Sequence, residues 1–240
     1  MARVPSGADW RLLSEGYPEI LREDFAAFIH KCFMTLNPGT EFLPNWHIEL
    51  IADYLQACRR REIKRLIINM PPRALKSICV SVAWPAFLLG HNPSERIMAA
   101  SYAAGLSMKH SLDCRNVLLS DWYGRAFPDV TLSASQNEKH KFVTTAFGHR
   151  IATSVGGSAT GEGGNFLIVD DPQNPAQVLS DATRNAANAW FDHTFASRLD
   201  DKKDGVMVVV MQRLHADDLT GHLLTKGGWE HLCLTAIAER

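Results

Sequence analysis

Apolar and polar positions change their period several times along the chain after about residue 64. Short apolar runs alternate with longer segments in which apolar residues recur at helical spacing. We expect strands at 65–70, 96–102, 165–172, 205–212 and 229–237, and a hairpin over 141–155 that turns at Phe147-Gly148-His149. Helices are expected at 77–89, 103–119, 180–198 and 216–224. This alternation predicts βαβ units and therefore an α/β fold with a mostly parallel central sheet.

Two helices are expected before the first of these strands. Residues 18–36 carry apolar side chains such as Phe25 and Phe28 at helical spacing. A turn follows, and Asn45 is placed to cap a second helix that runs to about Cys58. We therefore divide the chain into an N-terminal helical extension, residues 1–40, and a main domain, residues 41–240.

The composition narrows the class of protein. A chain of 240 residues with 46% hydrophobic and 21% charged residues can bury a sizeable core. The net charge of -1 gives no global basic field of the kind many nucleic-acid-binding proteins show, so the basic run at 59–65 is either a local patch or a solvated surface. Five cysteines without C-x-x-C spacing argue against a disulfide framework or a zinc site and favour a reducing compartment. No stretch approaches 18 consecutive apolar residues, so no membrane span is expected.

Polar residues follow the predicted strands, at the edge where parallel sheets bind their ligands. The first such stretch is NMPPRALKS, in which a strand runs into a loop that ends at Lys76-Ser77 and then into a helix. In a phosphate-binding loop the lysine reaches the terminal phosphates and the serine holds Mg²⁺. Met70 and Leu75 stand where that pattern has glycines. The stretch is either a nucleotide site or an ordinary turn, and a nucleotide site requires suitable backbone angles at Ala74 and Leu75.

Two adjacent carboxylates, Asp170 and Asp171, end the predicted strand FLIVDDP. A Walker B element has this appearance: the first carboxylate reaches Mg²⁺ and the second polarises the attacking water. Two acids at the end of a buried strand cost free energy unless a cation or hydrogen bonds compensate. The alternative is a strand end at which Asp171-Pro172 starts a turn. Both motifs in one sheet favour nucleotide hydrolysis.

The next predicted strand, 205–212, ends at Gln212, where many P-loop motors place a group that senses the γ-phosphate. Asp217-Asp218 are better explained as the start of the following helix, because acidic residues stabilise a helix N-terminus. His215 has no partner at metal-ligand spacing. The glycine-rich stretch 156–166 lacks a following Lys-Ser and helix, so we interpret it as a flexible connection at the rim of the site.

Together these stretches resemble the ATPase domain of the large terminase subunit of tailed bacteriophages and related prophages. The matching segments are NMPPRALKS, AASYAAGLS, GGSATGEGG, LIVDDP and QRLHADDLTGHLL, and the similarity covers roughly residues 40–240. The resemblance implies a three-layer P-loop NTPase fold of the ASCE or RecA-like type. It also implies Mg²⁺-dependent ATP hydrolysis by a motor that moves double-stranded DNA into a viral procapsid, in the cytoplasm of the infected bacterial host.

The resemblance also implies roles for individual residues. Ser77 and Asp170 would hold Mg²⁺, and Asp171 would take the place of the catalytic acid. Lys76 and Arg73 would stabilise the charge of the transition state, and Gln212 would belong to the motif that couples hydrolysis to movement. The residues expected to contact ATP are Arg73, Ala74, Leu75, Lys76 and Ser77 in the loop, with Trp46 and His47 as candidates near the adenine.

The sequence departs from the family pattern at three positions. Leu75 replaces the glycine before the lysine, and Asp171 is one methylene shorter than the glutamate common in P-loop motors. Glu162 stands where relatives often carry an arginine that reaches a neighbouring subunit. That arginine would have to come from elsewhere, with Arg150 and Arg184 as candidates.

The resemblance implies partners as well. They are double-stranded DNA held by its backbone phosphates, the portal protein, the small terminase subunit and further copies of this chain in a ring of five, with a monomer as the alternative for the isolated chain. Family members usually continue into an RNase H-type nuclease domain, but the sequence stops at LTAIAER, so we expect no nuclease activity. Two alternatives stay open: another P-loop enzyme such as a helicase or small-molecule kinase, and a non-hydrolysing assembly module.

Overall fold

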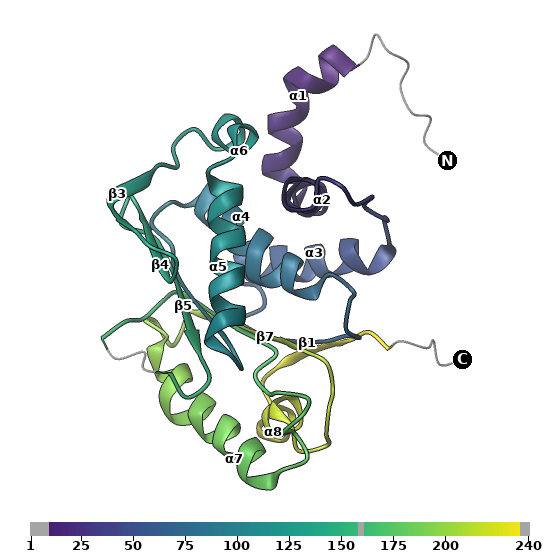
Figure 1. Ribbon diagram of the computed structural model, residues 1–240, viewed down its shortest axis with the longest axis vertical. Coiled ribbons are helices and arrows are strands. Elements are labelled where there is room, and N and C mark those ends of the chain that lie inside the picture. Colours follow the sequence, from purple (N-terminus) through teal and green to yellow (C-terminus); the bar gives the residue numbers. More distant parts are fainter. Residues whose placement is uncertain (1–9, 158–160, 236–240) are drawn as a thin grey trace.

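The fold is built on one sheet, which crosses the middle of the molecule (Figure 1). The computed structural model describes residues 10–157 and 161–235, with the backbone alone for residues 10–16. Within these residues the sheet has eight strands in the order β3-β4-β5-β2-β6-β7-β1-β8. The strands are β1 (Arg65–Asn69), β2 (Arg96–Ser101), β3 (Leu132–Asn137), β4 (Lys141–Thr144), β5 (His149–Ser154), β6 (Phe166–Asp170), β7 (Val206–Met211) and β8 (Glu230–Cys233). All neighbours from β5 to β8 pair in parallel, and β3 and β4 are antiparallel at one edge.

Helices cover both faces of the sheet. Figure 1 shows α3 (Trp46–Arg59), α4 (Trp84–His91) and α5 (Ala104–Leu118) on one face and α7 (Asp181–Trp190) and α8 (Leu219–Lys226) on the other. Successive strand residues point to opposite faces, so Val208 belongs to the core under the first group of helices and Val209 to the core under the second. Because both faces are buried, the strands read as continuous apolar runs. The predicted α/β fold with a mostly parallel sheet between helical layers is confirmed.

The predicted N-terminal helix over 18–36 is wrong as a single element. The structure has α1 (Trp10–Glu23) and α2 (Phe25–Leu36), with a break at Asp24. The Asp24 side chain accepts a hydrogen bond from the Ala27 N–H at 3.0 Å, which ends one helix and caps the next. Phe25 and Phe28 of α2 pack on Phe87 of α4, so α2 shares the core of the main domain.

Other differences from the expected elements also have local causes. The structure adds α6 (Asp121–Ala126) and the edge strand β3, whose polar sequence gave no strand signal. Asp218 accepts a hydrogen bond from the Gly221 N–H at 3.0 Å, and α8 therefore starts at Leu219 rather than 216. Asn45 stands at the cap position of α3, but its side chain makes no capping hydrogen bond.

Several expected elements are confirmed. The hairpin over 141–155 forms as β4 and β5, and the helix over 180–198 continues from α7 through η2 (Phe191–Phe195) and η3 (Ala196–Arg198). The last predicted strand is present as β8, although its final residues, 236 and 237, lie outside the described part of the chain. The helix expected over 77–89 begins with a π-helical segment, η1 (Ile78–Ala83), before α4.

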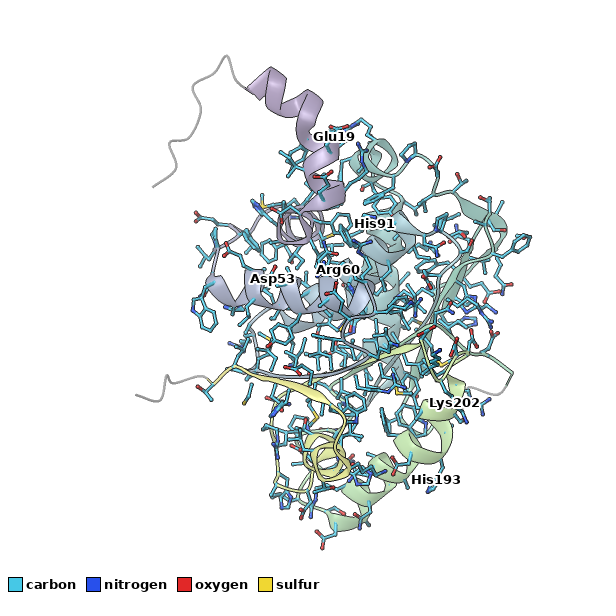
Figure 2. All side chains as sticks on the ribbon, turned by 180° about the vertical axis from the view of Figure 1, so that it is seen from behind. Glu19, Asp53, Arg60, His91, His193 and Lys202 are labelled. Carbon is cyan, nitrogen blue, oxygen red and sulfur yellow. The ribbon has the colours of Figure 1, made fainter. Side chains whose placement is uncertain are left out.

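The basic run at 59–65 is largely neutralised by nearby acids. Arg60, at the end of α3 in Figure 2, contacts Glu62 at 2.7 Å, and Lys64 contacts Asp204 at 3.0 Å. Arg61 contacts Glu95 at 3.3 Å. This pairing favours the interpretation of the run as a solvated surface. Among the described helices, none combines the length and apolar character that crossing a bilayer would need.

Candidate functional site

The strand order brings three predicted motifs to the same edge of the sheet. β7 lies between β1 and β6, with Asn69 opposite Met211 and Asp170 opposite Val210. The loops that follow these strands therefore meet. The Asp171 N–H donates to the Val210 carbonyl at 2.9 Å, and the Gln212 N–H donates to Asp171 Oδ1 at 3.4 Å. The site thus lies at the carboxyl ends of parallel strands, where α/β sheets bind ligands.

The loop after β1 contains no glycine, yet two of its residues adopt backbone angles that usually favour glycine. Arg73 and Leu75 lie in the left-handed region, with φ of 63° and 61°, and Ala74 between them does not. Alternating left- and right-handed residues turn successive N–H groups toward one point and form an anion-binding nest. The helix that begins at Lys76 adds the positive end of its dipole at the same place.

A left-handed conformation costs a residue other than glycine about 1–2 kcal/mol. Such strain persists only where the surrounding structure over-determines the backbone. Ala74 and Leu75 are half-buried and pack against the core cluster beneath α3 and α4. We infer that this packing offsets the cost at Leu75. The left-handed angle at Leu75 is therefore compatible with the fold, and phosphate binding by the loop stays a prediction.

Lys76 reaches from this loop to the second carboxylate of the Asp-Asp pair. Its side chain is 9% exposed, and Nζ lies 2.8 Å from Asp171 Oδ2. Burial and the neighbouring charge of Asp170 raise the pKa of Asp171, and the hydrogen bond and charge of Lys76 lower it in part. Asp171 itself is left-handed, with φ of 47°, a conformation that aspartate tolerates better than most residues.

Asp170 is the most enclosed carboxylate of the site, with 1% of its surface exposed. Its Oδ2 accepts a hydrogen bond from Ser81 Oγ at 2.7 Å and lies 3.5 Å from His110 Nδ1. Burial raises the pKa of Asp170, and hydrogen bonds from Ser81 and Ser77 lower it in part. The Ser77 hydroxyl therefore lies against the same carboxylate, and the structure brings Ser77 and Asp170 together.

The Asp170 and Ser77 oxygens fit a hard cation. Asp170 Oδ1 is buried and has no hydrogen-bond partner among the described residues, which is costly for a carboxylate oxygen. A carboxylate oxygen beside a serine hydroxyl is the donor set that Mg²⁺ prefers. These two residues would hold the ion predicted from the sequence.

An apolar groove opens beside the loop after β1. It has a volume of about 350 Å³ and is lined by Met70, Pro71 and Pro72 on the loop side and by Cys233, the last residue of β8, and Leu234 after it. Gln212 and Arg213 border the same groove, which connects it to Asp171. The groove is large enough for an organic ligand with its anionic end at the loop.

Two predicted contacts with the nucleotide lie at the start of α3. Trp46 is 65% exposed on the first turn of this helix, and His47 Nε2 is enclosed without a hydrogen-bond partner among the described residues. Within the described residues neither side chain hydrogen-bonds to the loop after β1. Their assignment near the adenine therefore stays a prediction.

Both candidates for an arginine that reaches a neighbouring subunit are wrong. Arg150 is fully buried and donates from Nη2 to the Ser81 carbonyl at 3.0 Å. Arg184 is 5% exposed and binds the Val178 carbonyl and the Asp181 carboxylate. Glu162 is paired with Lys141 at 2.6 Å, and residues 158–160 of the glycine-rich stretch lie outside the described part of the chain. Arg73, by contrast, is exposed on the loop itself.

Sequence reasoning missed the polar side chains that surround Asp170. Ser81 could have been named from the sequence, because it is a polar residue in an apolar helical run, four residues after Ser77 and on the same helix face. Arg150 gave a weaker signal, a charged residue in the second strand of the predicted hairpin. His110 lies on α5, and burial lowers its pKa to about 4, so its imidazole is neutral at pH 7.

Comparison with known proteins gives a structural likeness alone. No family model matches the sequence, and no curated protein sequence is similar to it. The fold is similar to the crystal structure of the HK97 bacteriophage large terminase, with a TM-score of 0.53 and 16% sequence identity. The match covers 91% of this chain and 44% of the terminase, so this chain spans less than half the length of that protein. At this identity the comparison shows that the chain has a terminase-like fold.

Proposed function

We propose that this chain is the ATP-hydrolysing domain of a DNA-packaging motor of the phage large-terminase type. One observation carries the proposal: Lys76, Ser77, Asp170 and Asp171 meet at the carboxyl ends of the parallel strands, below a loop whose two left-handed residues favour an anion nest. A nest, a buried lysine and paired carboxylates are the parts that phosphoryl transfer requires. The terminase-like fold supports the choice among P-loop enzymes.

The contacts support a separate role for each residue of the site. Lys76 contacts Asp171, so an incoming phosphate would take over the lysine charge and free the Asp171 carboxylate to accept a proton from the attacking water. The backbone N–H groups of the loop and the exposed Arg73 would hold the phosphate oxygens. Mg²⁺, held by Ser77 and Asp170, would neutralise developing charge. Gln212 borders both Asp171 and the groove, as a residue that senses the phosphate would.

Release of phosphate from Mg²⁺-ATP by the purified chain, with and without double-stranded DNA, tests the proposal. DNA-stimulated turnover without strand separation supports a packaging motor, and strand separation favours a helicase. Failure to bind a non-hydrolysable ATP analogue would instead support an assembly module.

The portal protein, the small terminase subunit and a ring of further copies are the partners we propose. A ring would supply an arginine in trans, an addition worth about 10³–10⁵-fold in rate, so the isolated chain should turn over slowly.

The loop geometry predicts opposite results for two substitutions of Leu75. Glycine adopts a φ of 61° without strain, so Leu75→Gly should keep or improve affinity for a Mg²⁺-bound ATP analogue. A β-branched residue is a severe outlier there, so Leu75→Val should weaken the affinity about tenfold, which is about 1.4 kcal/mol. Calorimetric titration measures both. Equal affinities in the two variants would show that the left-handed loop does not bind phosphate.

We propose that the apolar groove holds the nucleoside, and Cys233 reports on this. Burial raises the pKa of Cys58, Cys79 and Cys114 to about 12, so a maleimide should label the exposed Cys233 first. An ATP analogue at about ten times its Kd should slow the labelling about tenfold, because only the free protein reacts. Inorganic phosphate, which leaves the groove open, is the control. Unslowed labelling at saturating analogue would place the nucleoside elsewhere.

A further inference from the structure

Three buried polar residues surround Asp170, and the proposed mechanism gives none of them a role. Ser81, His110 and Arg150 are 1%, 5% and 0% exposed. Ser81 lies on η1 and His110 on α5, two helices that pack against each other on one face of the sheet, and Arg150 lies on β5, against which α5 also packs. Buried polar groups cost free energy unless they are paired, so a cluster of this kind has to be explained by what it holds in place.

Ser81 connects Arg150 to Asp170. Its hydroxyl donates to Asp170 Oδ2 at 2.7 Å, and its carbonyl accepts from Arg150 Nη2 at 3.0 Å. His110 Nδ1 lies 3.5 Å from the same Oδ2. These contacts occupy Oδ2 and leave Oδ1 as the unpartnered oxygen of the carboxylate among the described residues.

The local helix geometry accounts for the position of Ser81. It lies in the π-helical segment η1, which follows Ser77 directly. Ser77 and Ser81 are four residues apart, so both hydroxyls face the same carboxylate from one helix. Short π-helical segments are rare and are frequently found at functional sites. Arg150 holds the backbone of this segment, although its Nε and Nη1 have no partner among the described residues.

We propose that Ser81, held in place by Arg150, is a positioning residue that fixes the Asp170 carboxylate so that Oδ1 faces the metal ion. This inference rests on the proposed function, because it assigns the ion to Ser77 and Asp170. Outer partners of this kind orient metal ligands, and their loss typically costs about 10–100-fold in metal affinity. Ser81 itself would not touch the ion or the nucleotide.

The test separates metal affinity from nucleotide affinity. Affinity for an ATP analogue is measured by calorimetry in EDTA, and affinity for Mn²⁺ by electron paramagnetic resonance at saturating analogue. Ser81→Ala should weaken Mn²⁺ binding by about 10–100-fold and leave metal-free analogue affinity unchanged. Ser81→Cys, which keeps the volume and weakens the donor, should lose Mn²⁺ affinity in the same direction.

Ser107→Ala is the matched control. Ser107 is also a buried serine, 2% exposed, and its hydroxyl donates to the Ala99 carbonyl rather than to Asp170. It should cost similar stability and leave Mn²⁺ affinity at the wild-type value. Equal effects of Ser81→Ala and Ser107→Ala would overturn the positioning role while leaving the ATPase proposal intact. Wild-type protein that binds no Mn²⁺ with the analogue would overturn both.

Discussion

Replacing Lys76 by alanine is expected to lower kcat/KM for Mg²⁺-ATP by about 10²–10³-fold. The Lys76 ammonium is desolvated, with 9% of the side chain exposed, and lies 2.8 Å from Asp171. A charge in such a site acts on the transition state far more strongly than one in water. Its loss also leaves Asp171 without the cation that lowers the carboxylate pKa, so the base would be protonated more easily. Steady-state phosphate release measures the effect.

Lys109→Ala controls for removing a lysine from the same layer of helices. Lys109 lies on α5, its side chain is 68% exposed, and Nζ contacts Asp113 one turn along the helix. Surface pairs of this kind contribute little to stability, so turnover should stay at the wild-type level. Circular dichroism of both variants checks the fold. A Lys76→Ala variant with more than about a tenth of wild-type kcat/KM would argue against a catalytic lysine.

Asp171→Asn is expected to lower kcat by about 10²–10⁴-fold with little change in affinity for ATP. Asparagine accepts the left-handed backbone at this position, where φ is 47°, so the turn after β6 should persist. The amide cannot accept a proton from water. Burial and Asp170 raise the pKa of Asp171 in the free protein, so wild-type kcat/KM should fall with decreasing pH at a higher pH than an ordinary aspartate would give. The asparagine variant should lack this acid limb.

The Asp171→Asn prediction also has a matched control. Asp217→Asn removes a carboxylate whose side chain is 80% exposed, directly before the N-cap residue of α8, and should leave kcat unchanged. Rapid-quench measurement of a single turnover separates the chemical step from product release. If Asp171→Asn keeps wild-type single-turnover rates, a different residue activates the water and the proposed division of roles is wrong.

The sheet could be predicted from the sequence because its central strands are buried on both faces. Runs such as Val206–Met211 are continuous and apolar, and the helices between them carry a different period. β3 could not be predicted, because it is a polar edge strand held by β4 rather than by burial. The break between α1 and α2 could have been predicted, since Asp24 is a strong helix N-cap residue inside an apolar pattern.

The residues of the candidate site could also be predicted, because the carboxyl ends of parallel strands lie together on one side of the sheet. Lys76, Ser77, Asp170 and Asp171 were named from their motifs, and the structure brings them together; their roles stay proposals. The sequence alone could not predict contacts between residues that lie far apart in the chain. Ser81 and Asp170 are 89 positions apart, and only the fold shows that they share a hydrogen bond. The backbone angle of Leu75 is likewise set by packing that no local pattern reveals.

We propose that a loop without glycine binds the phosphates of ATP while Ser77 and Asp170 hold the metal ion beside them. A crystal structure with a non-hydrolysable ATP analogue and Mn²⁺ shows whether this is so, because anomalous scattering locates the ion. We expect the β- and γ-phosphates against the backbone N–H groups around Leu75 and Lys76, with the ion between the Ser77 hydroxyl and the Asp170 carboxylate. An analogue bound away from this loop, or an ion that neither residue approaches, would contradict it.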